Sequence, residues 1–151
     1  MSTLRQTFAS FDEYCVEHVE PWGVDVDLPF VNAYHFAHYI DEVLLPNQRI
    51  SEIQDAFRLL DKLFLAGDEA TRDLIGIGVI EDLQSLLSGR VEEYSTLVPL
   101  LPQTLLKVWQ QVEKQWAGKN SLIELIEAES AQPPIFRTWA QILSLPEVSS
   151  Q

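Results

Sequence analysis

Apolar residues recur every three or four positions along most of this chain, in blocks that prolines and glycines separate. In the first block these positions are Leu4, Phe8, Phe11, Cys15 and Val19. Such spacing places side chains on one face of a helix, whereas a half-buried strand has an apolar residue at every second position. The later blocks repeat the pattern, and none shows a convincing strand alternation. The sequence therefore predicts an all-α fold.

The predicted helices lie between residues that end helices, such as Pro46 and Gly118. Residues 24–29 form an extended connector whose valines would make at most one short strand, and no partner strand is evident. We expect a single domain over residues 1–151, made of six to eight antiparallel helices, with a stacked helical repeat as the alternative arrangement. The predicted helices cover residues 4–19, 30–45, 51–66, 69–87, 91–101 and 103–117, followed by short helices from 121 and over 133–143.

Several residues are placed to cap helix ends. Ser51 and Gln54 have the spacing of a capping box, which predicts a helix N-terminus at Ser51. Gly67 stands where a C-cap glycine belongs, and Asp68 is placed to cap the helix that follows.

The helix predicted over residues 69–87 is apolar on nearly every side in its middle, which is typical of a central, buried helix. Gly76 and Gly78 lie inside it, although each glycine costs roughly 1 kcal/mol relative to alanine there. Two residues correspond to about 200° around the helix axis, so the two glycines face opposite sides. We expect neighbouring helices to approach closely on both flanks; a local break in the helix is the competing prediction.

Charge is distributed unevenly along the 151 residues, whose net charge is −13. Residues 1–93 hold eighteen carboxylates and six Lys or Arg, a net −12, and residues 94–151 hold five and four, a net −1. Such a field repels nucleic acid and anionic lipid, and it attracts basic proteins. Acidity that serves only solubility is the simpler interpretation.

Other features narrow the class of protein. A hydrophobic content of 46% is enough for a packed core. No apolar run approaches the roughly 18 residues of a membrane span, and the first residues do not resemble a secretory signal. Cys15 is the only cysteine, which excludes an internal disulfide and a cysteine-based zinc site. We expect a cytoplasmic protein without a cofactor.

Two clusters of side chains are candidate reactive sites. His35, His38 and Glu42 recur along one predicted helix and could form a metal site, but packed or surface histidines are the commoner explanation. Cys15 and His18 lie one helical turn apart, yet Cys15 is on the apolar stripe, where a thiol is usually inert. The glycines at 76 and 78 follow no strand, so they do not form a phosphate-binding loop. The sequence predicts no enzyme activity.

Acidic residues are the candidate contacts with a partner. Carboxylates near the start of the helix over residues 69–87 have a local role as well, because they interact favourably with the helix dipole. Two others lie well inside that helix, so at least one of the two is expected to reach the surface or a basic partner. The candidate partner-binding residues are Asp25, Asp27, Asp41, Glu42, Asp68, Glu69, Asp73, Glu81 and Asp82.

One stretch resembles a known family. Residues 63–84 read LFLAGDEATRDLIGIGVIEDLQ and are similar to helical bacterial immunity proteins of polymorphic toxin systems, including contact-dependent growth inhibition. The pattern is an apolar helix, a Gly-Asp-Glu turn and a second helix ending in Glu-Asp-Leu-Gln. Val79 and Ile80 replace the aromatic and aliphatic pair of that pattern.

The resemblance implies a small cytoplasmic helical domain that binds one cognate toxin and blocks its active site. Many such toxins are nucleases with basic surfaces, which an acidic partner would meet rapidly. The expected partner is therefore a basic toxin domain, not nucleic acid or a membrane. An acidic adaptor or nucleic-acid mimic that binds another basic protein is the alternative.

Overall fold

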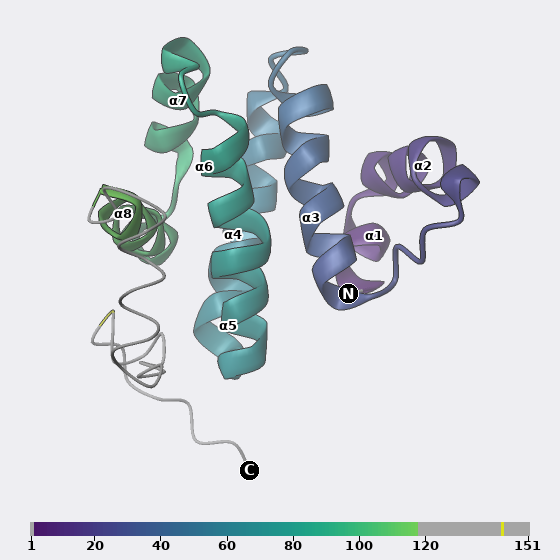
Figure 1. Ribbon diagram of the computed structural model, residues 1–151, viewed down its shortest axis with the longest axis horizontal. Helices are drawn as coiled ribbons and strands as arrows, with labels where there is room; N and C mark the ends of the chain where they lie inside the picture. Colours follow the sequence, from purple (N-terminus) through teal and green to yellow (C-terminus); the bar gives the residue numbers. More distant parts are fainter. Residues whose placement is uncertain (1, 118–142, 144–151) are drawn as a thin grey trace, which may run out of the picture.

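The computed structural model describes residues 2–117 and residue 143, and within them it is all-α, as predicted (Figure 1). The helices predicted from 121 and over 133–143 lie outside these residues, except for residue 143. Two of the helices continue through π-helical segments. The elements are α1 (Ser2–Thr7), α2 (Ala9–His18), the 3-10 turn η1 (Glu20–Trp22), α3 (Pro29–Tyr39) with π segment η2 (Ile40–Leu44), α4 (Ile50–Ala66), α5 (Glu69–Ile75) with π segment η3 (Gly76–Glu81) and α6 (Asp82–Leu86), α7 (Val91–Leu97) with the 3-10 turn η4 (Val98–Leu100), and α8 (Gln103–Ala117).

The centre of the fold is an up-down-up arrangement of three rods (Figure 1). The α3–η2 rod and the α5–η3–α6 rod lie side by side and run in the same direction, and α4 runs antiparallel to both. In Figure 1, α1 and α2 lie on one side of this centre and α7 and α8 on the other. The predicted antiparallel packing is therefore seen for α3 with α4 and for α4 with α5, whereas the α3–η2 and α5–η3–α6 rods are parallel neighbours.

Aromatic residues hold the outer helices onto the centre. Phe11 of α2 meets Phe36 of α3 edge-on, with ring centroids 4.9 Å apart, and both are fully buried. On the other side, the fully buried Trp109 of α8 donates from its indole nitrogen to the hydroxyl of Tyr94 in α7, at 2.8 Å. Gln84 of α6 donates to the backbone carbonyl of Trp109 at 2.9 Å. No helix in the described part of the chain combines the length and apolar character needed to cross a membrane.

The prediction of one helix over residues 4–19 is wrong. Phe8 adopts an extended conformation, with φ −113° and ψ 95°, and separates α1 from α2. The backbone bond from the Phe8 amide to the Leu4 carbonyl is kept at 2.9 Å, so the chain kinks and then resumes its helix. Because the apolar spacing continues through the kink, periodicity alone does not reveal it.

One of the three predicted caps is wrong. Helix α4 begins at Ile50, so Ser51 lies inside the helix and forms no capping box. Gly67 is the C-cap of α4, as predicted, and its backbone is extended, with φ −82° and ψ 165°. A Cβ at Gly67 would lie 2.6 Å from the carbonyl oxygen of Leu63, so lack of space is what requires glycine there. The third cap is confirmed: Asp68 Oδ1 accepts a bond from the Thr71 amide at 2.9 Å.

The glycine-containing helix is continuous through residues 69–86, and its middle is the π segment η3. Gly78 supports the prediction of a close approach, because a Cβ there would lie 2.8 Å from the Cβ of Ala33 in α3. π-Helical turns are rare and are frequent at functional sites. The segments η2 and η3 carry three of the predicted partner-binding residues, Asp41, Glu42 and Glu81.

Candidate protein-binding site

One face of the α3–η2 rod carries a row of polar and aromatic residues at four-residue intervals, Phe30, Tyr34, His38 and Glu42, here called the α3 stripe. Phe30 and Tyr34 are 53% and 45% exposed, which is high for side chains of this size. Phe30 also leans toward η3, since its ring lies 3.5 Å from the position of a Cβ at Gly78. The stripe therefore begins with exposed aromatic surface and ends in a carboxylate.

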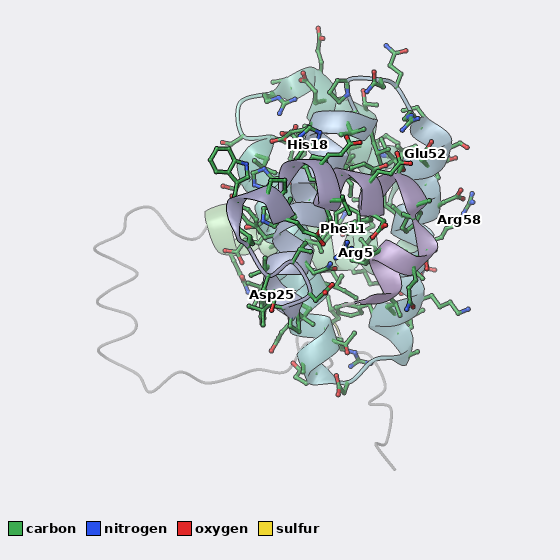
Figure 2. All side chains as sticks on the ribbon, turned by 90° about the vertical axis from the view of Figure 1, so that its right-hand side faces the viewer. Arg5, Phe11, His18, Asp25, Glu52 and Arg58 are labelled. Carbon is green, nitrogen blue, oxygen red and sulfur yellow. The ribbon has the colours of Figure 1, made fainter. Side chains whose placement is uncertain are left out.

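A cavity of about 440 Å³ opens beside the C-terminal half of the α3 stripe. Helix α2 supplies one wall, and α3 with η2 supplies the other. All three histidines of the chain line this cavity, here called the histidine pocket. In the side-chain view, His18 and Asp25 lie toward opposite ends of the same face of the molecule (Figure 2). The lining residues are Tyr14, His18, Val19, Tyr34, His35, His38, Glu42 and Val43.

Glu42 connects the two walls of the histidine pocket. Its Oε2 accepts a hydrogen bond from the Tyr14 hydroxyl at 2.8 Å, and its Oε1 lies 3.4 Å from His38 Nδ1. Burial raises the pKa of Tyr14, and the bond to Glu42 raises it further. Burial also lowers the pKa of His35, and the neighbouring His38 adds to that effect. The phenol of Tyr14 and the imidazole of His35 are therefore neutral near pH 7, while Glu42 brings negative charge.

The alternative of a metal site at His35, His38 and Glu42 finds no support in the geometry. Zinc needs its ligand atoms within about 2.0–2.2 Å of one point. Within residues 2–117 and 143 no group of three or more His, Cys, Asp or Glu side chains is arranged to hold a metal ion.

Two further predicted residues lie near the histidine pocket. Asp82 interacts electrostatically with His38; burial raises the pKa of Asp82, and His38 partly opposes that rise. Asp41 forms an ion pair with Arg90, and the Asp41 side chain is only 12% exposed. Asp41 thus ties η2 to the loop before α7. Glu81 precedes Asp82 at the end of η3 and is partly exposed.

Asp25 and Asp27 belong to a different cluster, organised by Arg5 of α1. The Arg5 guanidinium contacts three carboxylates, at 2.8 Å for Asp12, 2.9 Å for Glu20 and 3.1 Å for Asp27. Asp25 accepts a bond from the Asp27 amide at 3.1 Å, which shapes the connector before α3. Arg5 was not among the predicted site residues, because its partners lie up to 22 residues away in the sequence.

Asp68, Glu69 and Asp73 lie at or near the start of α5. Asp68 caps this helix, and the bonds from Thr71 lower the pKa of its carboxyl. Asp82 lies 14 positions after Asp68, which corresponds to roughly 20 Å along the rod, and Glu81 lies eight positions after Asp73, or roughly 12 Å. The structure therefore does not join this group with Glu81 and Asp82 into one site.

Cys15 and His18 do not form a reactive pair. Cys15 is fully buried, and burial raises the pKa of its thiol to about 11. The His18 side chain is 63% exposed, lies 3.8 Å from Glu17 and packs beside Tyr14 in the histidine pocket. A buried thiol with a raised pKa is a poor nucleophile.

We expect Cys15 to stay unreacted when the native protein is treated with a thiol-specific reagent at mildly alkaline pH, and to react fully in concentrated urea. Its pKa is higher in the folded state, so the folded chain holds the thiol proton more tightly. Stability should therefore fall as pH rises from about 9 through about 11. Labelling kinetics and urea unfolding across this range measure both effects.

The matched control moves the thiol to the surface of the same helix, as Cys15→Ala combined with Val16→Cys, because Val16 is 48% exposed. This variant should react at once when native, and its stability should fall less steeply with rising pH, because only the raised tyrosine pKa values such as that of Tyr14 still contribute. Rapid labelling of native Cys15 would contradict the burial.

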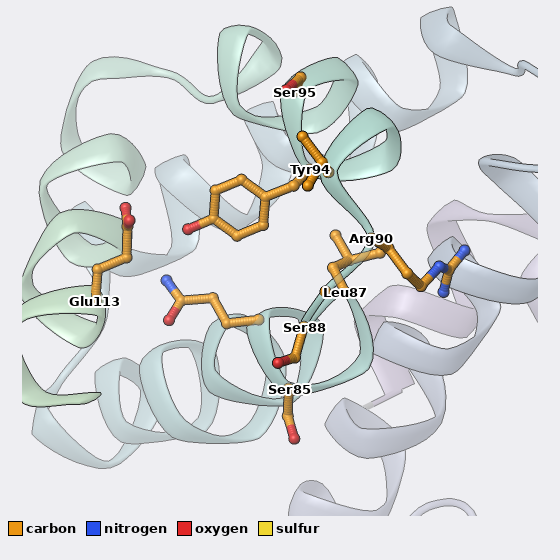
Figure 3. A pocket seen from close by; sticks show the side chains of 10 residues that line it. Ser85, Leu87, Ser88, Arg90, Tyr94, Ser95 and Glu113 are labelled. Carbon is orange, nitrogen blue, oxygen red and sulfur yellow. The ribbon is translucent and has the colours of Figure 1, made fainter. Parts of the chain in front are cut away.

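A second cavity, of about 520 Å³, lies between α6, α7 and α8 (Figure 3). Tyr94 and Glu113 face it, whereas the Arg90 guanidinium points away from it (Figure 3). The Tyr94 hydroxyl and the Gln84 amide that line it are already bonded to Trp109. These bonds join α8 to α6 and α7, so a structural role accounts for the Tyr94 and Gln84 side chains of this larger cavity.

The chain was compared with protein families, curated proteins and solved structures. No curated protein and no solved structure matches it. Residues 1–117 match the model of a domain of unknown function, DUF7674, and the chain belongs to that family.

Proposed function

We propose that this protein is an immunity protein that binds a basic toxin domain and neutralises it. The observation that carries the proposal is the α3 stripe, in which exposed Phe30 and Tyr34 lead to the carboxylate of Glu42 beside the histidine pocket. Asp82, on the neighbouring rod, interacts electrostatically with His38 of the stripe and adds negative charge there.

The composition of this face suits a protein partner. Tyr, Phe and Trp are enriched at protein interfaces, and binding energy concentrates in a few buried aromatic residues. Ile77 of η3, which precedes Gly78 in the sequence, is 46% exposed and adds apolar surface on the neighbouring rod. The surrounding negative charge accelerates encounter with a basic surface and competes for groups that would hold a phosphate backbone. A toxin that acts on nucleic acid has such a surface.

The test is co-expression with a toxin domain, sought first among the genes beside the one for this protein. We expect the chain to restore growth and to bind the toxin domain in calorimetry, with an association rate that falls as salt rises. Tyr34→Ala should weaken binding about 30-fold, which corresponds to about 2 kcal/mol for an interface residue of this kind.

Glu92→Ala is the matched control, because Glu92 is exposed on α7 and lies outside the α3 stripe and the histidine pocket. It should leave growth rescue and affinity unchanged. Circular dichroism of both variants separates lost binding from lost folding. Binding to a basic protein that is not a toxin would favour the adaptor alternative, and absence of binding to any neighbouring toxin domain would refute the proposal.

A further inference from the structure

Two aromatic walls face the histidine pocket. On the α2 wall, Tyr14 and His18 lie one turn apart with ring centroids separated by 5.3 Å. On the α3 wall, Tyr34 and His38 lie one turn apart with centroids separated by 4.3 Å and ring planes inclined by 44°. His35 meets Tyr34 edge-on at 4.9 Å. The pocket thus offers ring faces from two helices.

One carboxylate lies between these walls. The Glu42 side chain is 52% exposed, so it is accessible from the pocket and from solvent. A carboxylate has about four acceptor positions, and Tyr14 and His38 use two of them at Glu42. The remaining positions and the negative charge are available to a donor that enters the pocket. Asp82, on the neighbouring rod, adds negative charge on the side of His38.

We propose that the histidine pocket receives the guanidinium group of an arginine from the partner protein. This inference rests on the proposed function and specifies its recognition chemistry. Cations are attracted to the faces of aromatic rings, and a guanidinium group stacks on such rings because it is planar. The same group donates two parallel hydrogen bonds to a carboxylate, here Glu42.

The size and charge of the pocket agree with this occupant. Its volume of about 440 Å³ lies within the range of small-ligand pockets, roughly 300–1,000 Å³. An anion would be repelled by Glu42, and a purely apolar side chain would leave the carboxylate without a new donor. Arginine also has an aliphatic stem that can lie against Val19 and Val43, which line the same pocket.

The experiment uses the full chain and two short peptides, acetyl-Gly-Arg-Gly-amide and the same peptide with citrulline in place of arginine. Citrulline has nearly the same shape but no charge. Titrations are followed by nuclear magnetic resonance, through the ring signals of Tyr34 and the three histidines. We expect saturable shifts with the arginine peptide, with a Kd on the order of 1–10 mM for one isolated side chain, and much smaller shifts with citrulline.

Variants of the chain locate the site. Glu42→Gln removes the charge while keeping an acceptor for Tyr14, and it should weaken arginine binding about tenfold. Tyr34→Leu should weaken it about fivefold through loss of a ring face. Glu92→Gln is the control for Glu42→Gln, since it makes the same change on α7 away from the pocket, and it should have no effect.

Equal responses to arginine and citrulline, or an arginine response that Glu42→Gln leaves unchanged, would overturn the inference. Neither result bears on growth rescue, so the proposed function can survive the failure of this inference. Conversely, selective arginine binding without any toxin partner would keep the pocket assignment and refute the immunity function.

Discussion

Replacing Arg72 by methionine should lower the free energy of unfolding by about 2–3 kcal/mol, because a buried hydrogen bond to a charged donor is lost. Arg72 of α5 is only 3% exposed, and its Nε donates to the carbonyl oxygen of Phe64 at 2.9 Å. That carbonyl belongs to the last turn of α4, where no later residue of the helix supplies a partner. The Arg72 guanidinium also lies 5.5 Å from the centroid of the Phe64 ring. Arg72 therefore completes the end of α4 and packs α5 against it.

Urea unfolding followed by circular dichroism measures the change in stability. The matched control is Arg58→Met, because Arg58 lies on α4 with a side chain that is 68% exposed and pairs with Asp55 one turn away. An exposed pair of this kind contributes about 0.2–1 kcal/mol. Similar losses of unfolding free energy for the two variants would show that Arg72 has no special role at the junction of α4 and α5.

Arg72 illustrates which parts of the fold are readable from sequence. Helix α8 matches its predicted range because it depends on local periodicity and on the residues that flank it. The Asp68 cap was predicted for the same reason, since it acts three residues along the chain. The end of α4 at Ala66 was also predicted, from Gly67. The bond that Arg72 of the next helix donates to Phe64 at this end was not predicted. Nothing local distinguishes that arginine from a surface residue.

In the candidate site, too, local spacing was predictable from the sequence and contacts between distant helices were not. The spacing of Phe30, Tyr34, His38 and Glu42 is visible in the sequence, and Glu42 was predicted as a partner contact. The other wall of the pocket was missed, because Tyr14 meets Glu42 across 28 positions of the chain. Such a contact depends on how α2 packs on α3, and periodicity carries no information about that.

The acidic character of the first ninety-odd residues is also less uniform than the count of charges indicates. Arg5 collects Asp12, Glu20 and Asp27 into one cluster, and Arg90 pairs with Asp41. Screened and paired charges contribute less to the field that a partner meets. Glu42 differs from them in that its partners are the Tyr14 hydroxyl and the His38 imidazole and not an arginine, so the pocket keeps a carboxylate near aromatic surface.

The contact between the two parallel rods gives the second large prediction. Gly78→Ala should lower the free energy of unfolding by about 1–2 kcal/mol, although alanine is favoured over glycine by about 1 kcal/mol inside a helix. The new Cβ would lie 2.8 Å from the Cβ of Ala33, which has no rotamer that could move it away. The rods must then separate, and the strain of such overpacking is typically about 1–3 kcal/mol. Separation would also displace His38 from Asp82.

A double-mutant cycle with Ala33→Gly isolates this contact. Ala33→Gly alone should cost about 1 kcal/mol through helix propensity, whereas the swapped pair, Ala33→Gly with Gly78→Ala, restores one methyl group between the rods. The swapped protein should therefore be more stable than the sum of the single changes indicates, by about 1–2 kcal/mol, which is a typical coupling for residues in contact. Additive effects in urea unfolding would mean that the two rods do not approach closely at this point. In that case another contact would position the α3 stripe beside η3. Arginine binding in the histidine pocket should then be insensitive to Gly78→Ala.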